Sequence, residues 1–99
     1  MIKGLTFEWD PVKAEANEAK HGVSFVEAVT VFGDPLARLV DDPEHSADEQ
    51  RDILFGESLS GRLLVIMHSE RAGRIRLISA REMTHRERNQ YERYQAESG

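Results

Sequence analysis

Three extended segments separated by short turns constrain the fold of this chain more than any other feature of its sequence. Residues 51–57, 63–69 and 74–81 are rich in apolar side chains, and each of the two turns between them contains a glycine. Because glycine adopts the backbone conformations that tight turns need, the three segments are predicted to form an antiparallel meander. Residues 63–67 are apolar on both faces, which is typical of a central strand.

Signals for helices lie on both sides of this meander. A short strand is expected at 5–8, followed by a helix at 11–20 that has Asp10 as its N-cap and Gly22 after its last turn. Two capping boxes predict the other helices. The boxes and the helices that they open are Ser24 with Glu27 for 25–32 and Thr84 with Glu87 for 85–95.

A further strand is predicted at 36–40, before an acidic loop at 41–49. This order of elements indicates an α+β fold, in which two N-terminal helices pack on a curved antiparallel sheet and a C-terminal helix follows. The helices cover one face of the sheet and leave the other free to bind a ligand. With 99 residues, the chain 1–99 is expected to form a single domain.

The composition excludes several classes of protein. The chain has no cysteine, which excludes a disulfide framework, thiolate metal sites and a cysteine nucleophile. Its longest apolar run, 63–67, is too short to cross a bilayer, and its first residues lack the apolar stretch of a signal peptide. We therefore expect a cytoplasmic protein that does not contact a membrane.

Charge is distributed unevenly along the chain. The formal net charge is −5, but residues 1–61 hold five Lys and Arg against thirteen Asp and Glu, whereas residues 62–99 hold eight Arg against five Glu. Arginine presents a planar, permanently charged fork that suits phosphate oxygens. An anionic ligand is therefore expected to bind the last third, unless these arginines form salt bridges with the acidic first part.

No motif for a metal or a cofactor stands out. His45 and Glu49 are four residues apart with Asp41 and Asp42 nearby, but Pro43 marks this stretch as a loop, so the spacing does not present ligands as a helix would. The sequence has no Gly-rich phosphate loop, dinucleotide-binding fingerprint or nucleophile elbow. We expect no metal and no cofactor.

The chemistry that remains is cleavage of RNA without a metal. This reaction needs a base for the 2′-hydroxyl, cations for the charge that develops on the phosphoryl oxygens, and an acid for the leaving 5′-oxygen. The residues able to serve in these roles are His21, His68, His85, Lys20, Arg62, Arg71, Arg74, Arg76, Arg81 and Glu82.

Strand alternation sorts some of these candidates. In a regular strand, one face carries Arg74, Arg76, Ile78 and Ala80, and the other carries Ile75, Leu77, Ser79 and Arg81. The apolar pair at 75 and 77 faces the core, which leaves the arginines at 74 and 76 on the free face. Arg81 can join them only if a bulge intervenes or if it lies beyond the end of the strand, and we expect it at the rim of the free face, where the chain turns into the last helix.

Two histidines have simpler structural interpretations. His68 is in line with Leu64 and Ile66, which favours a packed or surface histidine over a catalytic one. His21 is at the end of a helix, where its charge suits the helix dipole.

An ordered set of residues runs through most of the chain. Its first part is Phe7-Glu8-Trp9-Asp10-Pro11, Lys13-Ala14, Asn17, Lys20-His21-Gly22-Val23-Ser24-Phe25 and Glu27-Ala28. Its later part is Phe32, Asp34-Pro35, 42–45, Glu49, Arg51, Gly56, Ser58, Gly61-Arg62, Ile78-Ser79-Ala80-Arg81, Thr84, Glu87-Arg88 and Tyr91-Glu92. With this set, over residues 7–92, the chain resembles the BrnT family, the ribonuclease toxins of bacterial type II toxin–antitoxin pairs.

The resemblance implies a RelE-like fold, cleavage of RNA and a cognate BrnA-type antitoxin. Such an antitoxin binds the toxin and represses the operon through its own DNA-binding domain, so operator DNA is contacted only through the antitoxin. By analogy with RelE-like toxins, whose working arginines lie on the late strands, the expected site residues are Arg62, Arg76 and Arg81, with Lys20 and His21 next.

The first hypothesis is therefore a metal-independent endoribonuclease toxin that arrests growth. In this hypothesis Arg62, Arg76 and Arg81 converge on the open sheet surface and grip the scissile phosphodiester. The second is a non-catalytic binding module that keeps the antitoxin contact and acts only as an operon co-repressor. A third is a structural domain whose arginines are solvated.

Overall fold

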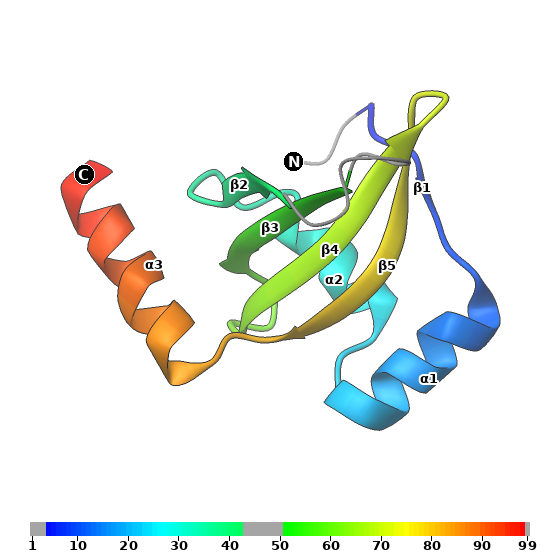
Figure 1. Cartoon of the computed structure of the whole chain (residues 1–99), viewed down its shortest axis with the longest axis horizontal. Helices are drawn as coiled ribbons and strands as arrows, with labels where there is room; N and C mark the ends of the chain where they lie inside the picture. Colours follow the sequence, from blue (N-terminus) through cyan, green and yellow to red (C-terminus); the bar gives the residue numbers. More distant parts are fainter. Residues whose placement is uncertain (1–3, 43–50, 99) are drawn as a thin grey trace.

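The computed structural model describes residues 4–42 and 51–98. Its elements, in chain order, are β1 (Phe7–Glu8), α1 (Pro11–His21), α2 (Phe25–Val31), β2 (Arg38–Asp41), β3 (Arg51–Glu57), β4 (Leu63–Arg71), β5 (Arg74–Glu82) and α3 (His85–Ser98). Figure 1 shows α2 behind the sheet, α1 beside β5 at the lower right, and α3 at the far left. The predicted α+β class is confirmed.

The sheet has the strand order β1-β5-β4-β3-β2, with β4 in the centre as predicted. Strands β3, β4 and β5 pair in antiparallel fashion, which confirms the meander. The prediction of a wholly antiparallel sheet is wrong, because β1 runs parallel to β5. No hairpin turn joins β1 to β5, since the rest of the fold lies between them in sequence, so nothing local sets their relative direction.

One face of the sheet carries the hydrophobic core. Leu64 and Ile66 of β4 are fully buried there, and burying a side chain of this size stabilises the fold by about 2 kcal/mol. The other buried members of the cluster are Val23, Phe25, Ala28, Val31, Leu54, Leu77 and Ala80. The core therefore joins α2 and the chain segment before it to the three central strands.

Local signals set the helix ends as predicted. The side chain of Asp10 accepts a hydrogen bond from the backbone N–H of Val12, and Gly22 adopts a left-handed conformation with φ of 71° after α1. Ser24 accepts a hydrogen bond from the N–H of Glu27 at the start of α2. These caps satisfy backbone groups that a helix end leaves without partners.

Two strands begin later than predicted. β1 comprises only Phe7–Glu8, and β2 begins at Arg38 instead of Leu36. The side chain of Asp34 accepts a hydrogen bond from the N–H of Leu36, and its carbonyl oxygen accepts one from Ala37. This turn occupies the backbone groups that an earlier start of β2 would need.

A bulge in β5 changes which of its side chains share a face. Met67 pairs with Ser79, but the next residue, His68, pairs with Leu77, so Ile78 is an extra residue in β5. An extra residue reverses the alternation of side chains along the rest of the strand.

Regular alternation is therefore a wrong prediction beyond the bulge. Ala80, expected on the free face, is fully buried in the core. Arg81 shares the free face with Arg76. Their partners in β4 are Val65 and Ser69, and these two lie on one face because β4 has no extra residue and side chains an even number of positions apart point the same way.

Helix α3 packs through one buried side chain. Tyr91 is 3% exposed, and its hydroxyl donates a hydrogen bond to the carboxylate of Asp34. The helix stands against the β2–β3 end of the face that α1 and α2 leave open. None of the helices in the described part of the chain is both long and apolar enough to span a membrane.

Candidate functional site

The face that α1 and α2 leave uncovered, here called the open face, carries two of the predicted site arginines. The prediction that this whole face is free is wrong, because α3 packs on one end of it, and Val65 and Ser69 of β4 are 6% and 0% exposed. Arg76 and Arg81 both extend from β5 on this face, opposite Ser69 and Val65 of β4. These partners are four positions apart along β4, which corresponds to about 13 Å at the usual rise of a strand. The bulge thus creates a strip of sheet with an arginine at each end.

Arg76 is paired with a carboxylate from β1. The Oε2 atom of Glu8 lies 3.6 Å from Nη1 of Arg76, and its Oε1 atom lies 3.3 Å from Nη1 of Arg74. The side chain of Arg76 is 35% exposed. A pair this accessible to water is worth at most about 1 kcal/mol, so an anionic ligand can replace the carboxylate.

Arg81 is paired with a carboxylate from α3. Its guanidinium donates two parallel hydrogen bonds to Glu87, at 2.7 and 2.9 Å. The N–H of Thr84 also donates to this carboxylate, and the Thr84 hydroxyl accepts from the N–H of Glu87, which confirms the predicted capping box. The hydrogen bonds from Arg81 are the main cause that lowers the pKa of Glu87 from 4.5 to about 2. Glu87 therefore stays ionised and occupies Arg81 as two phosphate oxygens would.

A groove runs from Glu87 between α3 and the sheet. It has a volume of ≈ 190 Å³ and is lined by Arg38, Val40, Phe55, Glu87, Gln90 and Tyr91. Beside it, the guanidinium of Arg38 lies 4.6 Å from the ring centre of Tyr94. In proteins that bind single-stranded nucleic acids, cationic side chains such as arginine bind the phosphates, and aromatic rings stack on the bases.

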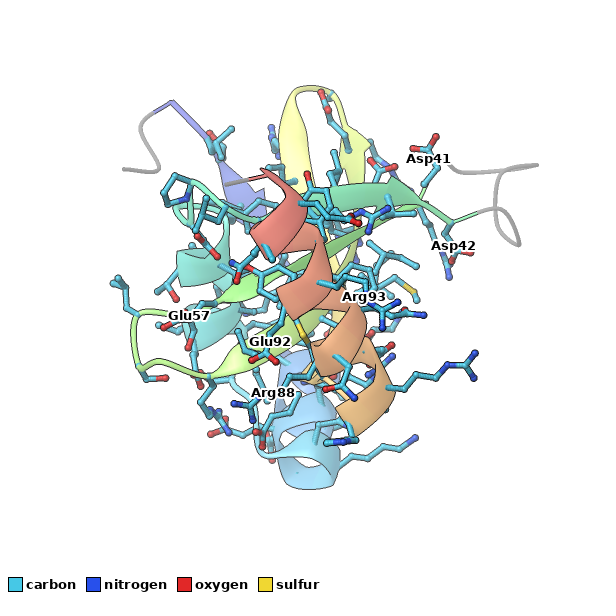
Figure 2. The ribbon with its side chains drawn as sticks, turned by 90° about the vertical axis from the view of Figure 1, so that its left-hand side faces the viewer. Asp41, Asp42, Glu57, Arg88, Glu92 and Arg93 are labelled. Atoms are coloured by element: carbon cyan, nitrogen blue, oxygen red, sulfur yellow. The ribbon has the colours of Figure 1, made fainter. Side chains whose placement is uncertain are left out.

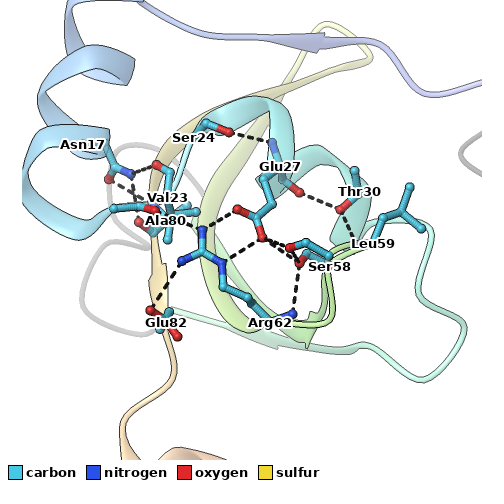
Figure 3. Close-up of polar contacts among 12 residues, drawn as sticks. Asn17, Val23, Ser24, Glu27, Thr30, Ser58, Leu59, Arg62, Ala80 and Glu82 are labelled. Carbon is cyan, nitrogen blue, oxygen red and sulfur yellow. Dashed lines mark hydrogen bonds and ion pairs between the residues drawn. The ribbon is translucent and has the colours of Figure 1, made fainter.

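Arg62 points into the helical layer instead of the open face. Its guanidinium donates hydrogen bonds to both carboxylate oxygens of Glu27 in α2, and to the carbonyl oxygen of Gly22 at 3.0 Å. Glu27 also accepts hydrogen bonds from Ser58 and Ser60 in the β3–β4 loop (Figure 3). The hydrogen bond from Arg62 is the largest cause that lowers the pKa of Glu27 from 4.5 to about 2. Arg62 thus ties the loop to α2.

The five predicted site residues form two groups. Lys20 and His21 end α1 and directly precede the glycine whose carbonyl oxygen Arg62 binds. This group lies in the helical layer, whereas Arg76 and Arg81 lie on the open face. The prediction that three arginines converge on one open surface is therefore wrong, because Arg62 binds Glu27 of α2 on the helical side of the sheet.

Replacing Arg62 by methionine is expected to lower the free energy of unfolding by about 2 kcal/mol, because it leaves the half-buried Glu27 without its main hydrogen-bond donor. The two side chains are 32% and 18% exposed. Denaturant unfolding measures the loss. Arg88 pairs with Glu92 on the outer side of α3 (Figure 2), and Arg88→Met is a matched control that should change stability by less than about 0.5 kcal/mol. Equal losses in the two variants would contradict this role of Arg62.

His68 is packed in the core. It is 5% exposed, its ring centre lies 5.0 Å from that of Phe32 in an edge-on contact, and Asp52 of β3 lies opposite. Neither ring nitrogen has a hydrogen-bond partner among the described residues. Burial lowers the pKa of His68 from 6.5 to about 4, so the ring is neutral at physiological pH. The sequence interpretation of His68 as a packed residue is confirmed.

Acidification from about pH 7 to about pH 5 is expected to destabilise the fold by about 2 kcal/mol through His68. The unfolded chain binds a proton below its pKa of 6.5, whereas the folded state resists protonation down to about 4, so stability is lost as the pH falls between these values. The carboxylates of Glu27 and Glu87 lose their contribution only below about pH 4.5, so they do not obscure this interval. Denaturant unfolding at both pH values should show a drop that His68→Phe removes. A drop of the same size in the variant would contradict this assignment.

The remaining candidates are spread over the surface. His85 is exposed at the start of α3, and Arg71 is exposed at the end of β4. The Oε2 atom of Glu82 lies 3.5 Å from Nη1 of Arg62. His45 and Glu49, which were considered for a metal, lie outside the described residues. Within residues 4–42 and 51–98, no group of three His, Asp or Glu side chains is arranged to hold a metal.

Sequence reasoning did not identify the carboxylates that hold these arginines. Glu8 and Glu27 bind arginines of the last third, which confirms the alternative of salt bridges to the acidic first part. Glu87 was predicted only as a helix cap. Its capping box begins at Thr84, three residues after Arg81. This short spacing is the one signal in the sequence that could have predicted the pair of Arg81 with Glu87.

Comparison with known proteins identifies relatives of this chain. Residues 9–87 match the family described as "Ribonuclease toxin, BrnT, of type II toxin-antitoxin system". The crystal structure of the Brucella abortus ribonuclease toxin BrnT has a similar fold, with a TM-score of 0.62 and 23% sequence identity over 81% of this chain and 97% of that chain. Among curated proteins, none matches this sequence.

Proposed function

Because this chain belongs to the BrnT family of ribonuclease toxins of type II toxin–antitoxin systems, we propose that it cleaves RNA and thereby arrests growth. The observation that carries this proposal is the presence of Arg76 and Arg81 on the same open face of the sheet. Two permanently charged side chains, whose partners in β4 lie about 13 Å apart along the strand, suit an RNA strand that lies along β5 and contacts them with different phosphates.

The proposed RNA path continues under α3. Beyond Arg81, the groove offers Phe55 on its floor and the stacked pair of Arg38 and Tyr94 at its side. Aromatic rings and guanidinium planes accept unstacked bases of a single strand whatever their sequence. Double-stranded RNA lacks such free bases, so we propose a single-stranded substrate.

We propose Arg81 as the arginine that stabilises the scissile phosphate. A bidentate guanidinium matches two phosphoryl oxygens, and it stabilises the negative charge that gathers on them as the 2′-oxygen attacks. The phosphate replaces the carboxylate of Glu87, which holds the same two donors in the free chain. Because guanidinium supplies the positive charge, we propose that cleavage needs no metal ion.

Lys20 and His21 stay proposed site residues, but they lie on the helical side of the sheet, so we assign them no proton transfer at a phosphate bound to Arg81. Arg62 binds both the carbonyl oxygen of Gly22 and the carboxylate of Glu82, so the end of α1 lies close to the end of β5. That end of β5 also carries Arg81, although on the other face of the sheet. We further propose that the fold is RelE-like and that the antitoxin is of the BrnA type, which contacts operator DNA on behalf of the pair.

Incubation of the purified, antitoxin-free chain with single-stranded RNA tests the proposal. We expect cleavage that continues in excess EDTA and that is lost on DNA of the same sequence, because only RNA carries the 2′-hydroxyl. Cleavage that EDTA abolishes would overturn metal independence, and stable RNA in all conditions would overturn the proposed activity.

One observation favours the alternative of a non-catalytic co-repressor. Arg62, Arg76 and Arg81 are all paired with carboxylates in the free chain. If the antitoxin-free chain leaves RNA intact but still strengthens operator binding by the antitoxin, this alternative replaces the ribonuclease.

A further inference from the structure

Leu59 is a large apolar side chain that the fold holds out in water. It is 89% exposed and lies at the tip of the β3–β4 turn. In this turn the N–H of Gly61 donates a hydrogen bond to the carbonyl oxygen of Ser58. The turn is anchored, because the N–H of Leu59 donates to the hydroxyl of Thr30 at 3.0 Å, and this hydroxyl donates to the carbonyl oxygen of Glu27 (Figure 3). Helix α2 therefore fixes the position of an apolar group that stays exposed to water.

A pocket lies directly beside this leucine. It has a volume of ≈ 270 Å³ and is lined by Thr30, Gly33, Asp34, Pro35, Glu57, Ser58 and Leu59. Leu36, which is 57% exposed, follows the proline of this lining. Exposed apolar groups beside a preformed pocket are typical of the anchor positions of protein interfaces.

The pocket is negatively charged. Asp34 and Glu57 both line it, and the side chain of Glu57 is in no ion pair within the described part of the chain. Figure 2 shows Glu57 at the side of the molecule, next to α3. Burial, together with the charges of these two carboxylates, raises the pKa of Tyr91 to about 12. The pocket therefore suits a cationic side chain and repels phosphates.

We propose that this surface, formed by Leu59, Leu36 and the pocket with Asp34 and Glu57, is a docking site for the antitoxin. A segment of the antitoxin fits if it carries an Arg or Lys side chain for the pocket, next to an apolar residue that packs on Leu59. RNA does not fit, because its phosphates would meet the two carboxylates. The inference rests on membership of a toxin–antitoxin family and not on the proposed cleavage of RNA.

Calorimetric titration of the chain with its purified full-length cognate antitoxin tests this inference. Leu59→Ser is expected to raise the dissociation constant at least about 30-fold, and Glu57→Lys at least about tenfold, as for anchor residues of an interface. Val12→Ser is the matched control, because Val12 is 75% exposed on α1. It should change the dissociation constant by less than about twofold. Thermal unfolding verifies that each variant is folded, and RNA cleavage by the free variants should equal that of the wild type.

The possible results of these measurements either support or overturn the docking site. A dissociation constant that is unchanged in either variant overturns the proposed site, even if the free chain cleaves RNA as expected. A change in the oligomeric state of the free chain on Leu59→Ser assigns the surface to a second copy, and weaker RNA binding assigns it to RNA; both results overturn the antitoxin proposal. Loss of antitoxin binding together with normal cleavage supports it.

Discussion

Replacing Arg81 by alanine is expected to slow RNA cleavage by the antitoxin-free chain at least about 100-fold, which is the usual effect of removing one donor that stabilises transition-state charge. Arg81 is the one arginine of the open face that presents two parallel donors to a carboxylate among the described residues. Arg81→Lys keeps the charge but loses the bidentate geometry, so it should recover only a small part of the activity. Initial rates on a labelled RNA oligonucleotide measure both variants.

Glu87→Gln separates the chemistry of Arg81 from its structural pairing. The substitution removes the charge that competes for the guanidinium, so RNA binding should tighten although the cap of α3 weakens. Arg88→Ala changes an exposed arginine on the outer side of α3 and should leave the rate unchanged. Full activity of Arg81→Ala would contradict the proposed site, as would equal losses for Arg81→Ala and Arg88→Ala.

Replacing Asn17 by alanine is expected to lower the free energy of unfolding by about 3 kcal/mol, because buried backbone groups lose their partners. The side-chain amide donates to the carbonyl oxygens of Val23 and Ala80, at 3.0 and 2.8 Å, and accepts from the N–H of Ala80 at 3.1 Å. Strand β1 pairs with β5 only at Ile75 and Arg76, so at Ala80 this amide takes the place of a neighbouring strand (Figure 3).

Denaturant unfolding measures the effect of Asn17→Ala. The control is Ser24→Ala, which removes a single capping hydrogen bond next to the same turn and should lower stability by about 1 kcal/mol. If Asn17→Ala lowered stability no more than this control, the hydrogen bonds of the amide to the backbone of Ala80 would not stabilise the fold as proposed.

Local chemistry explains which parts of the fold the sequence predicts well. The N-cap at Asp10, the left-handed Gly22, the N-cap at Ser24 and the Thr84–Glu87 capping box depend on neighbours within a few residues, and they form as predicted. The predicted Ser24–Glu27 box forms only in its Ser24 half, because the carboxylate of Glu27 accepts hydrogen bonds from Arg62, Ser58 and Ser60. The central strand is also predicted from a local pattern. Residues 63–67 are apolar at every position, which indicates a strand covered on both faces, and β4 is central in the sheet.

Long-range geometry explains what the sequence did not predict. The bulge at Ile78 depends on the pairing of β4 with β5, so regular alternation assigned Ala80 to the wrong face, whereas Arg81 joins the free face through a bulge, the first of the two routes considered for it. The pair of Arg62 with Glu27 joins residues 35 positions apart, so no local pattern reports it. This pair is the reason why the predicted convergence of three arginines fails.

The position of bound RNA decides whether Arg76 and Arg81 hold the substrate. The isotope-labelled chain can be titrated with a short single-stranded RNA whose 2′-hydroxyls are methylated, so that it binds without being cleaved, while the Nε–Hε signals of the arginines are followed by NMR. We predict shifts at Arg76 and Arg81 and none at Arg62, whose Nε–H is bound to Glu27. Shifts confined to Arg62 and to the amides of Lys20 and His21 would locate the RNA on the helical layer and overturn the proposed site.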